Sequence, residues 1–210
     1  MRTGNGLLDL STPAIMGILN VTPDSFFDGG KFEGVDAALA QTETMLEEGA
    51  DIIDIGGMSS RPGASIISAD EEMSRVLPVI DAIHKRFADV ILSIDTIYSQ
   101  TAAAAIDAGA GIINDISAAA LDANIIQVAI DKKLPYILMH MQGKPQDMQT
   151  APVYDNVVQE VFQFLLTTTR SLEARGLYDI VIDPGFGFGK TLEHNYRLAA
   201  HLDQIAMIGK

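Results

Sequence analysis

The segment VILSIDT, residues Val90 to Thr96, is an apolar run of the kind that forms a buried strand, and it ends in a carboxylate, Asp95. Similar runs recur along the chain. Runs without polar alternation are typical of strands covered on both faces, as in a parallel sheet. We therefore predict six strands, at Ala14–Leu19, Asp51–Ile55, Val90–Ile94, Gly111–Asn114, Pro135–Met139 and Asp179–Ile182.

Helical patterns lie between these runs. They predict helices at Asp36–Glu48, Asp70–Phe87, Ser99–Ala108, Asn124–Lys132 and Asn156–Arg175. Glycine, which commonly ends a helix, follows three of them, at Gly49, Gly109 and Gly176. The alternation of strand and helix predicts an α/β fold.

The placement of polar residues favours one form of this fold. Such residues come directly after predicted strands, at Asn20, Asp95, Asn114, His140 and Asp183. Strand ends converge on one mouth if the strands form a ring, whereas an open doubly wound sheet offers chiefly one crevice. We therefore predict a TIM (β/α)8 barrel as a single domain, residues 1–210. Because the predicted strands number six, we expect strands seven and eight to belong to a longer protein.

Composition excludes several classes of function. The chain has 210 residues, 48% of them hydrophobic, a net charge of −14 and no cysteine. The lack of cysteine excludes disulfides and zinc–thiolate sites. The negative charge argues against general binding to nucleic acid or to anionic membranes. The sequence shows neither a signal-peptide pattern nor a long apolar span, which predicts a cytoplasmic location.

Three strand ends carry candidate ligand-binding groups, each with a plainer interpretation. In IDIGGMSSRPG the glycine pair could bring the backbone close to a ligand or simply make a tight turn, and Arg61 before Pro62 suits a phosphate or carboxylate. Asp95 could bind a ligand or cap the following helix. Asn114 could cap a turn or bind the edge of a heterocycle, because an amide both donates and accepts.

The segment IDPGFGFGKT, residues 182–191, invites a nucleotide-binding interpretation that its spacing does not support. A P-loop needs four residues before Gly-Lys-Thr, but only three separate Gly185 from Gly189, and Pro184 removes an N–H. We interpret the segment instead as a loop that presents Asp183, Phe186 and Phe188. The histidines show no metal-binding spacing, so we predict no histidine metal site.

Six motifs in register resemble the dihydropteroate synthase family. They are MGILNVTPDSFFDGG, IDIGGMSSRPGA, ILSIDT, IINDIS, LMHMQGKPQDMQ and IDPGFGFGKTLEHNY, which extend from Met16 to Tyr196. The resemblance implies a TIM barrel. It also implies that a dihydropterin pyrophosphate condenses with para-aminobenzoate, with the help of Mg²⁺, to give dihydropteroate and pyrophosphate. A homodimer is implied as well.

The resemblance also assigns roles to residues of this chain. It implies that Asp95, Asn114 and Asp183 bind the pterin edge, that Asn20 lies beside the metal, and that Arg61 closes on the diphosphate or the second substrate. Asp95 and Arg61 would be catalytic. The remaining substrate-binding residues, most of them around the aminobenzoate ring, would be Ser60, Pro62, Phe26, Phe188 and Met139.

Two departures from the family pattern keep alternatives open. Met58 stands where a polar or aromatic residue is expected, and the groups of the seventh and eighth strands do not follow HLDQI. One alternative is a related pterin-binding barrel that transfers a methyl group from a reduced folate. Another is a truncated homologue that binds pterin without catalysis, since a protein complete without these groups would be expected to show little or no catalysis.

Overall fold

The computed structural model describes residues 1–3, 6–22, 31–58, 66–143, 148–150 and 152–210. Its main sheet has six parallel strands in the order β3-β4-β5-β6-β7-β8. They are β3 (Met16–Asn20), β4 (Ile52–Gly56), β5 (Ile91–Asp95), β6 (Ile112–Asp115), β7 (Tyr136–Met139) and β8 (Ile180–Asp183). A short antiparallel pair, β1 (Arg2–Thr3) and β2 (Gly6–Leu7), precedes it. All six predicted strands are confirmed, with ends that differ by one or two residues.

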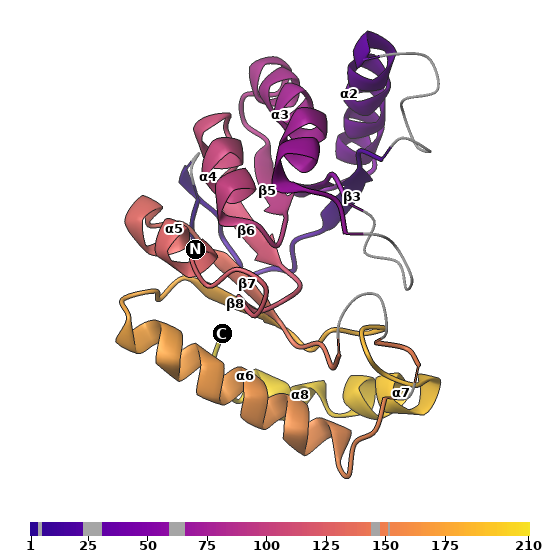
Figure 1. Ribbon diagram of the computed structural model, residues 1–210, viewed down its shortest axis with the longest axis vertical. Coiled ribbons are helices and arrows are strands. Elements are labelled where there is room, and N and C mark those ends of the chain that lie inside the picture. The colour runs from indigo at the N-terminus through magenta and orange to yellow at the C-terminus, as the bar shows by residue number, and fades with distance from the viewer. Residues whose placement is uncertain (4–5, 23–30, 59–65, 144–147, 151) are drawn as a thin grey trace.

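Helices follow the strands and surround the sheet. They are α2 (Lys31–Glu47), α3 (Ala69–Arg86), α4 (Ser99–Asp107), α5 (Ile125–Lys132), α6 (Val157–Ala174), α7 (Leu192–Ala200) and α8 (Leu202–Ala206). Figure 1 shows them arranged one after another around the outside of the strands. Among the described residues, no helix is both long and apolar enough to cross a membrane.

The strand order distinguishes the two predicted forms of the fold. Each strand pairs with the strand that precedes it and the strand that follows it in the chain, without reversal. A doubly wound sheet requires a reversal, and its ligand site lies there. The prediction of a barrel is therefore confirmed. The arrangement is that of a (β/α)8 barrel, of which six strands are present here, with β3 and β8 as the outer strands of the sheet.

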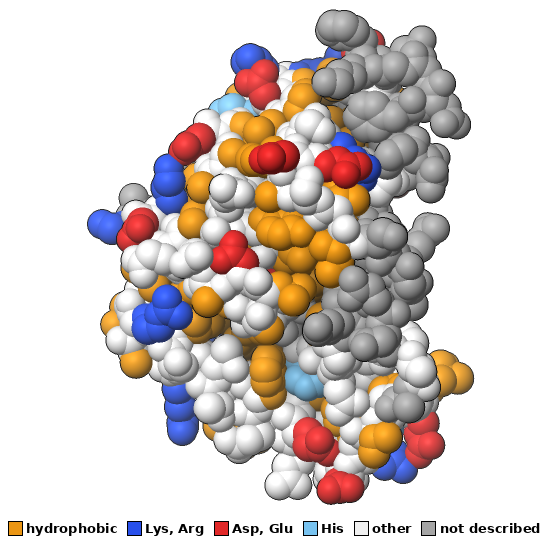
Figure 2. All heavy atoms as spheres, viewed as in Figure 1, with side chains coloured by type: hydrophobic (Ala, Val, Ile, Leu, Met, Phe, Trp, Pro, Cys, Tyr) orange, Lys and Arg blue, Asp and Glu red, His pale blue; other side chains and the backbone are white. Residues whose placement is uncertain are grey.

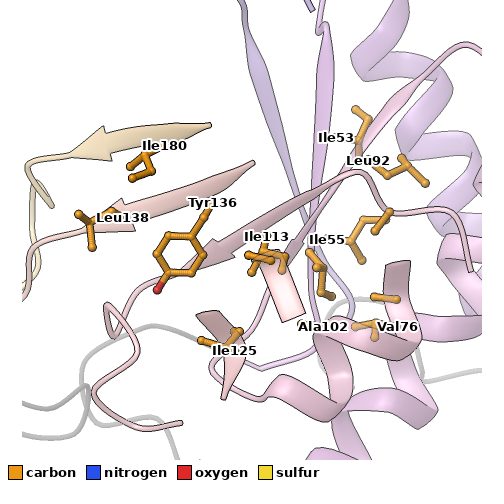
Figure 3. Packing of buried hydrophobic residues seen from close by; sticks show 14 of the residues in the cluster. Ile53, Ile55, Val76, Leu92, Ala102, Ile113, Ile125, Tyr136, Leu138 and Ile180 are labelled. Carbon is orange, nitrogen blue, oxygen red and sulfur yellow. The ribbon is translucent and has the colours of Figure 1, made fainter. Parts of the chain in front are cut away.

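The outer face of the sheet packs against the helices. Figure 3 shows Ile53, Leu92, Ile113 and other buried side chains of the strands beside Val76 of α3 and further residues of the helices. Burying an aliphatic side chain of this size stabilises a protein by about 1.5–3 kcal/mol. Because side chains alternate along a strand, this packing turns the residues between them, such as Asp54, toward the inside of the barrel.

The inner face is apolar at the amino ends of the strands. There Ile52, Ile112 and Ile137 are buried in one cluster, with Met1 and Leu8 of the N-terminal segment packed against it. Closer to the carboxyl ends of β3 to β6 the inward-facing residues become polar. The fold thus closes one end of the barrel with hydrocarbon and leaves polar groups at the other.

The outer surface carries mixed charge. In the face shown by Figure 2, basic side chains are scattered singly among acidic ones over the described residues. A surface that binds a nucleic-acid backbone needs clustered cations. The described part of this face therefore does not resemble such a surface.

Candidate active site

Residues at the carboxyl ends of four neighbouring strands lie in one row, and three of them carry polar side chains. Asn20 of β3 is in register with Gly56 of β4, Gly56 with Asp95 of β5, and Asp95 with Asn114 of β6. We call these four residues the strand-end row. Residues in register on parallel strands point to the same face, and Asn114 reaches the inward-facing Asp54. The row therefore faces the inside of the barrel.

Gly56 leaves space between two members of the row. A Cβ atom added at Gly56 would lie 3.3 Å from Asp95 Oδ2 and 3.5 Å from Asn20 Oδ1. The two oxygens thus approach the same point from the two neighbouring strands. Since glycine has no side chain, no side chain of β4 separates the two oxygens, and a ligand group above Gly56 could approach both.

Asn114 is held by a buried carboxylate. Its Nδ2 donates to Asp54 Oδ2 at 2.9 Å, and Asp54 is only 4% exposed. Burial raises the pKa of Asp54, and the nearby Ser93 and Asn114 partly counter this rise. Among the described residues, Asp54 Oδ1 and the Ser93 hydroxyl make no hydrogen bond of normal geometry. The amide of Asn114 is thereby oriented, and its Oδ1 is left for a ligand.

Asp95 lies in an acidic environment. Burial raises its pKa well above the usual value, and the charges of Asp54, Glu72 and Asp115 raise it further. Asp95 nevertheless keeps part of its surface exposed. A carboxylate placed among other carboxylates is stabilised by a cation or by N–H donors, so this arrangement favours a ligand that supplies one or the other.

Glu72 connects Asp95 to helix α3. Thr96, which follows Asp95, donates from its Oγ1 to Glu72 Oε2 at 2.5 Å, and Tyr98 N donates to the same hydroxyl at 3.1 Å. Glu72 is fully buried, and burial raises its pKa. This role could not be predicted from the sequence, because Glu72 lies in the acidic first turn of a helix and glutamate side chains are mostly exposed.

Asp183 ends β8 at the same end of the barrel. It is in register with Met139 of β7, whose strand separates it from Asn114. Gly185 N donates to Asp183 Oδ1 at 2.7 Å and so fixes the carboxylate. Asn114 and Asp183 therefore lie at the same mouth, as the barrel prediction required.

An apolar cluster covers this mouth. Met58, Ile97, Ile116 and Met139 are buried in it, and the partly buried Phe188 packs against them. Met58, which departs from the family pattern, thus fills space in the cluster. A flat aromatic ligand bound by the strand-end row would contact these apolar side chains with its ring.

The structure places most of the predicted site residues together. Asn20, Asp95 and Asn114 share the row, Asp183 lies one strand beyond Met139, and Met139 and Phe188 share the apolar cluster. The remaining predictions, Phe26, Ser60, Arg61 and Pro62, lie outside the described residues. Asp54 was not among the predicted site residues, although a carboxylate within an apolar strand was a usable signal.

A second hollow lies elsewhere. A cavity of about 700 Å³ is lined by residues of α6, α7, α8 and adjacent positions, among them Phe162, Arg197 and Met207. None of its lining residues comes from a strand of the sheet. It therefore belongs to the outer layer of helices rather than to the site at the strand ends.

Comparison with known proteins agrees with this geometry. A sequence model of the family described as pterin binding enzyme matches residues 16–210. The chain therefore belongs to the pterin binding enzymes. Within them it groups with the dihydropteroate synthases, as its relatives show.

Three relatives illustrate the match. The dihydropteroate synthase of Haemophilus influenzae is 47% identical over 211 residues, which cover 100% of this chain and 76% of that protein. The Xanthomonas albilineans dihydropteroate synthase with 4-aminobenzoic acid is 45% identical, with a TM-score of 0.88 over 96% of this chain and 72% of that one. The same enzyme in complex with 7,8-dihydropteroate gives 41% identity and a TM-score of 0.84 over 96% of this chain and 71% of that one.

Proposed function

We propose that this chain condenses 6-hydroxymethyl-7,8-dihydropterin pyrophosphate with para-aminobenzoate to give 7,8-dihydropteroate and pyrophosphate. The observation that carries the proposal is the strand-end row, which faces the barrel interior beneath an apolar cluster. Membership of the family supports it. So do the relatives described with 4-aminobenzoic acid and with 7,8-dihydropteroate.

The polar groups suit the edge of a pterin. Its amino-pyrimidine edge presents adjacent N–H donors, and an ionised carboxylate accepts two of them. Asp95 and Asp183 would accept from these donors, and Asn114 would add its Oδ1. The donors would also offset the repulsion that Asp95 experiences from Asp54 and Glu72.

The chemistry follows from the placement of Asp95. The carbon–oxygen bond to the pyrophosphate breaks, and the electron pair leaves with the pyrophosphate. The methylene carbon becomes cationic and conjugated with the pterin ring, where the negative charge of Asp95 stabilises it. The amino nitrogen of para-aminobenzoate then forms the new carbon–nitrogen bond and releases a proton to pyrophosphate or water.

We propose that Asn20 supplies one oxygen ligand to a Mg²⁺ ion carried by the diphosphate. Asn20 is exposed, and its Oδ1 is directed toward the point above Gly56. Among the described residues, no group of three or more His, Asp or Glu side chains could hold a metal. A single protein ligand fits Mg²⁺, which keeps waters and binds substrate phosphates. When bound, the ion neutralises the leaving group.

Residues outside the described part complete the proposal. Arg61 would approach the diphosphate or the second substrate, and Phe26, Ser60 and Pro62 would surround the aminobenzoate ring together with Phe188 and Met139. We further propose that the protein acts in the cytoplasm as a homodimer. The family resemblance supports the dimer, and the match to bacterial dihydropteroate synthases such as that of Haemophilus influenzae supports the location.

Turnover with para-aminobenzoate tests this function. We expect the purified protein, with its seventh and eighth strands present, to release pyrophosphate from the dihydropterin substrate only when para-aminobenzoate is present. We expect Asp95→Ala to abolish pterin binding in calorimetric titration. A matched control is Asp107→Ala, which removes an exposed carboxylate paired with Lys132 at the far end of α4. Near-normal pterin affinity in Asp95→Ala would overturn the assignment of the site.

The same assay separates the alternatives. A methyltransferase-like barrel would bind a reduced folate but would release no pyrophosphate with para-aminobenzoate. A non-catalytic homologue would bind pterin with no turnover of either kind.

A further inference from the structure

Lys190 belongs to the motif that supplies Asp183 and Phe188, but the lysine itself has no role in the proposed reaction. The sequence GFGFGK resembles a nucleotide-binding loop, in which the lysine would reach a phosphate. In the structure Lys190 is only 2% exposed. Its ammonium group is therefore not presented to a ligand, and its contacts must be sought within the protein.

The ammonium group of Lys190 is surrounded by acceptors of the chain itself. Nζ donates to the carbonyl oxygens of Gly185 at 2.8 Å, Phe188 at 3.0 Å and His140 at 3.1 Å. It also lies 3.1 Å from His140 Nδ1. An ammonium group has three N–H donors, so three donors serve four acceptors. The ammonium group of Lys190 can only donate hydrogen bonds. Nδ1 of His140 must therefore be the acceptor, which makes it the unprotonated nitrogen of the ring.

The loop held by Lys190 is also docked closely on the end of β7. Gly185 has φ +71°, and a Cβ there would lie 2.0 Å from the carbonyl oxygen of His140. Gly189 has φ +62°, and a Cβ there would lie 2.3 Å from the carbonyl oxygen of Gln142. Tyr154 donates from its hydroxyl to Gly189 O at 2.9 Å. Lys190 thus fastens a loop that lies directly on the backbone after β7.

Two candidate substrate-binding residues depend on this loop. Gly185, whose carbonyl oxygen accepts from Lys190, donates its N–H to Asp183 Oδ1 at 2.7 Å. Phe188, whose carbonyl oxygen also accepts from Lys190, donates its N–H to Gly185 O at 3.1 Å and packs in the apolar cluster. The hydrogen bonds therefore run from Lys190 to the pterin-binding carboxylate and to the ring beside the second substrate.

We propose that Lys190 is a positioning residue that sets Asp183 and Phe188 together for the two substrates. This inference rests on the proposed function. Lys190 touches neither substrate and acts through the backbone of residues 185–188. The lowered pKa of Lys190, about 8, results first from burial and is partly offset by Asp183.

Amide exchange tests the positioning without any activity. The Gly185 and Phe188 N–H groups report on the bonds that depend on Lys190. In Lys190→Met, which keeps the hydrocarbon and removes the donors, we expect both amides to exchange at least about tenfold faster. Amides of α3 should be unchanged, and so should all amides in the control Lys85→Met, whose lysine is exposed on that helix. Unchanged exchange at Gly185 and Phe188 would overturn the inference.

Kinetics separate positioning from mere stability. We expect Lys190→Met to raise KM for both the pterin substrate and para-aminobenzoate by about tenfold, since each loses an oriented contact. We expect Lys190→Arg, which keeps N–H donors, to recover part of this loss. A variant that lowers the melting temperature but leaves both KM values unchanged would show a structural role only, and would contradict the inference. If the wild-type protein with all eight strands does not turn over at all, the proposed function fails, while the exchange result still stands.

The absence of cysteine allows a chemical rescue at this one position. Lys190→Cys can be alkylated in the unfolded state with 2-bromoethylamine, which rebuilds a lysine-like ammonium, or with 1-bromopropane, which gives a neutral side chain of the same shape. We expect only the aminoethyl product, after refolding, to recover slow exchange at Gly185 and Phe188. Equal behaviour of the two products would show that the ammonium group does not position the loop.

Discussion

Asn114 of β6 donates a hydrogen bond of 2.9 Å to Asp54 of β4, across the intervening strand β5. The bond joins a candidate substrate-binding amide to a carboxylate that lies deeper in the barrel. The bond thereby couples the side chains of two strands that are not neighbours in the sheet. The orientation of the amide then depends on a residue that need not contact the ligand.

Removal of this carboxylate should weaken pterin binding. We expect Asp54→Ala to lower pterin affinity by roughly tenfold, because loss of a hydrogen bond to a charged group costs about 1.5–3 kcal/mol and the amide is then free to rotate. Asp54→Asn keeps an oxygen that can accept from Asn114 Nδ2, so its affinity should stay closer to the wild type. Calorimetric titration with a pterin measures both variants, and equal losses in the two would show that the charge, not the hydrogen bond, matters.

Neutralising Glu72 should change stability with a defined dependence on pH. Its pKa is raised in the folded state, so the folded protein binds more protons than the unfolded chain above the ordinary value of 4.5. The stability of the wild type should therefore fall as pH rises through the raised pKa. We expect Glu72→Gln to remove this fall and to be more stable near pH 7 by roughly 1 kcal/mol, since its side-chain oxygen still accepts from Thr96.

Urea unfolding between pH 4 and pH 8 measures the difference. The control is Glu71→Gln, whose side chain is 50% exposed. If Glu72→Gln were less stable than the wild type at pH 7, a partner group would be stabilising the charged carboxylate in the folded protein. The predicted increase in stability would then be wrong.

The regular part of the fold could be predicted from local pattern. The strands are continuous apolar runs and the helices between them have apolar periodicity, so β3 to β8 and α2 to α6 were found. Helices α7 and α8 were missed. Helix α8 is short, whereas α7 is as long as α4 but begins without the usual capping-box sequence. Thr191 caps α7 by accepting from His194 N at 3.2 Å, while the His194 ring accepts from Thr191 N, and a histidine in that place is not the usual signal.

The site could be predicted only where it follows strand ends. Asn20, Asp95, Asn114 and Asp183 stand directly after apolar runs, and the barrel topology brings such positions together. The supporting residues Asp54, Glu72 and Lys190 could not be assigned in this way. Their roles depend on contacts between segments far apart in the sequence, such as that of Lys190 with His140, fifty residues earlier.

His140 should make the protein sensitive to acid. Burial, with Lys190 nearby, lowers the pKa of His140 to about 4 from the ordinary value of 6.5. The unfolded chain therefore takes up a proton between these values while the folded chain does not, and stability is lost as pH falls from about 6.5 to 4. We expect this loss to reach up to about 3 kcal/mol.

His140→Asn tests this origin of the acid sensitivity. An amide oxygen can replace Nδ1 as the acceptor for Lys190 but does not take up a proton in this range. We expect the variant to show a smaller loss of unfolding free energy between pH 6.5 and pH 4. As a control, His201→Asn removes an exposed histidine and should leave the pH profile unchanged. Parallel profiles for the wild type and His140→Asn would show that another group causes the loss.

The glycines of the loop after β8 provide a matched comparison of backbone strain and close contact. Gly185 and Gly187 both have positive φ, +71° and +83°, but a Cβ at Gly185 would lie 2.0 Å from His140 O, whereas a Cβ at Gly187 would meet nothing within 4 Å. Alanine at Gly187 should cost about 1–2 kcal/mol, the usual penalty of a left-handed residue. Alanine at Gly185 should cost clearly more, because the loop must move off the end of β7 and carry Asp183 with it. Thermal unfolding should therefore show a larger loss of stability in Gly185→Ala than in Gly187→Ala, and pterin titration should show that binding is lost only in Gly185→Ala. Equal stabilities of the two variants would show that the loop can shift freely without disturbing the site.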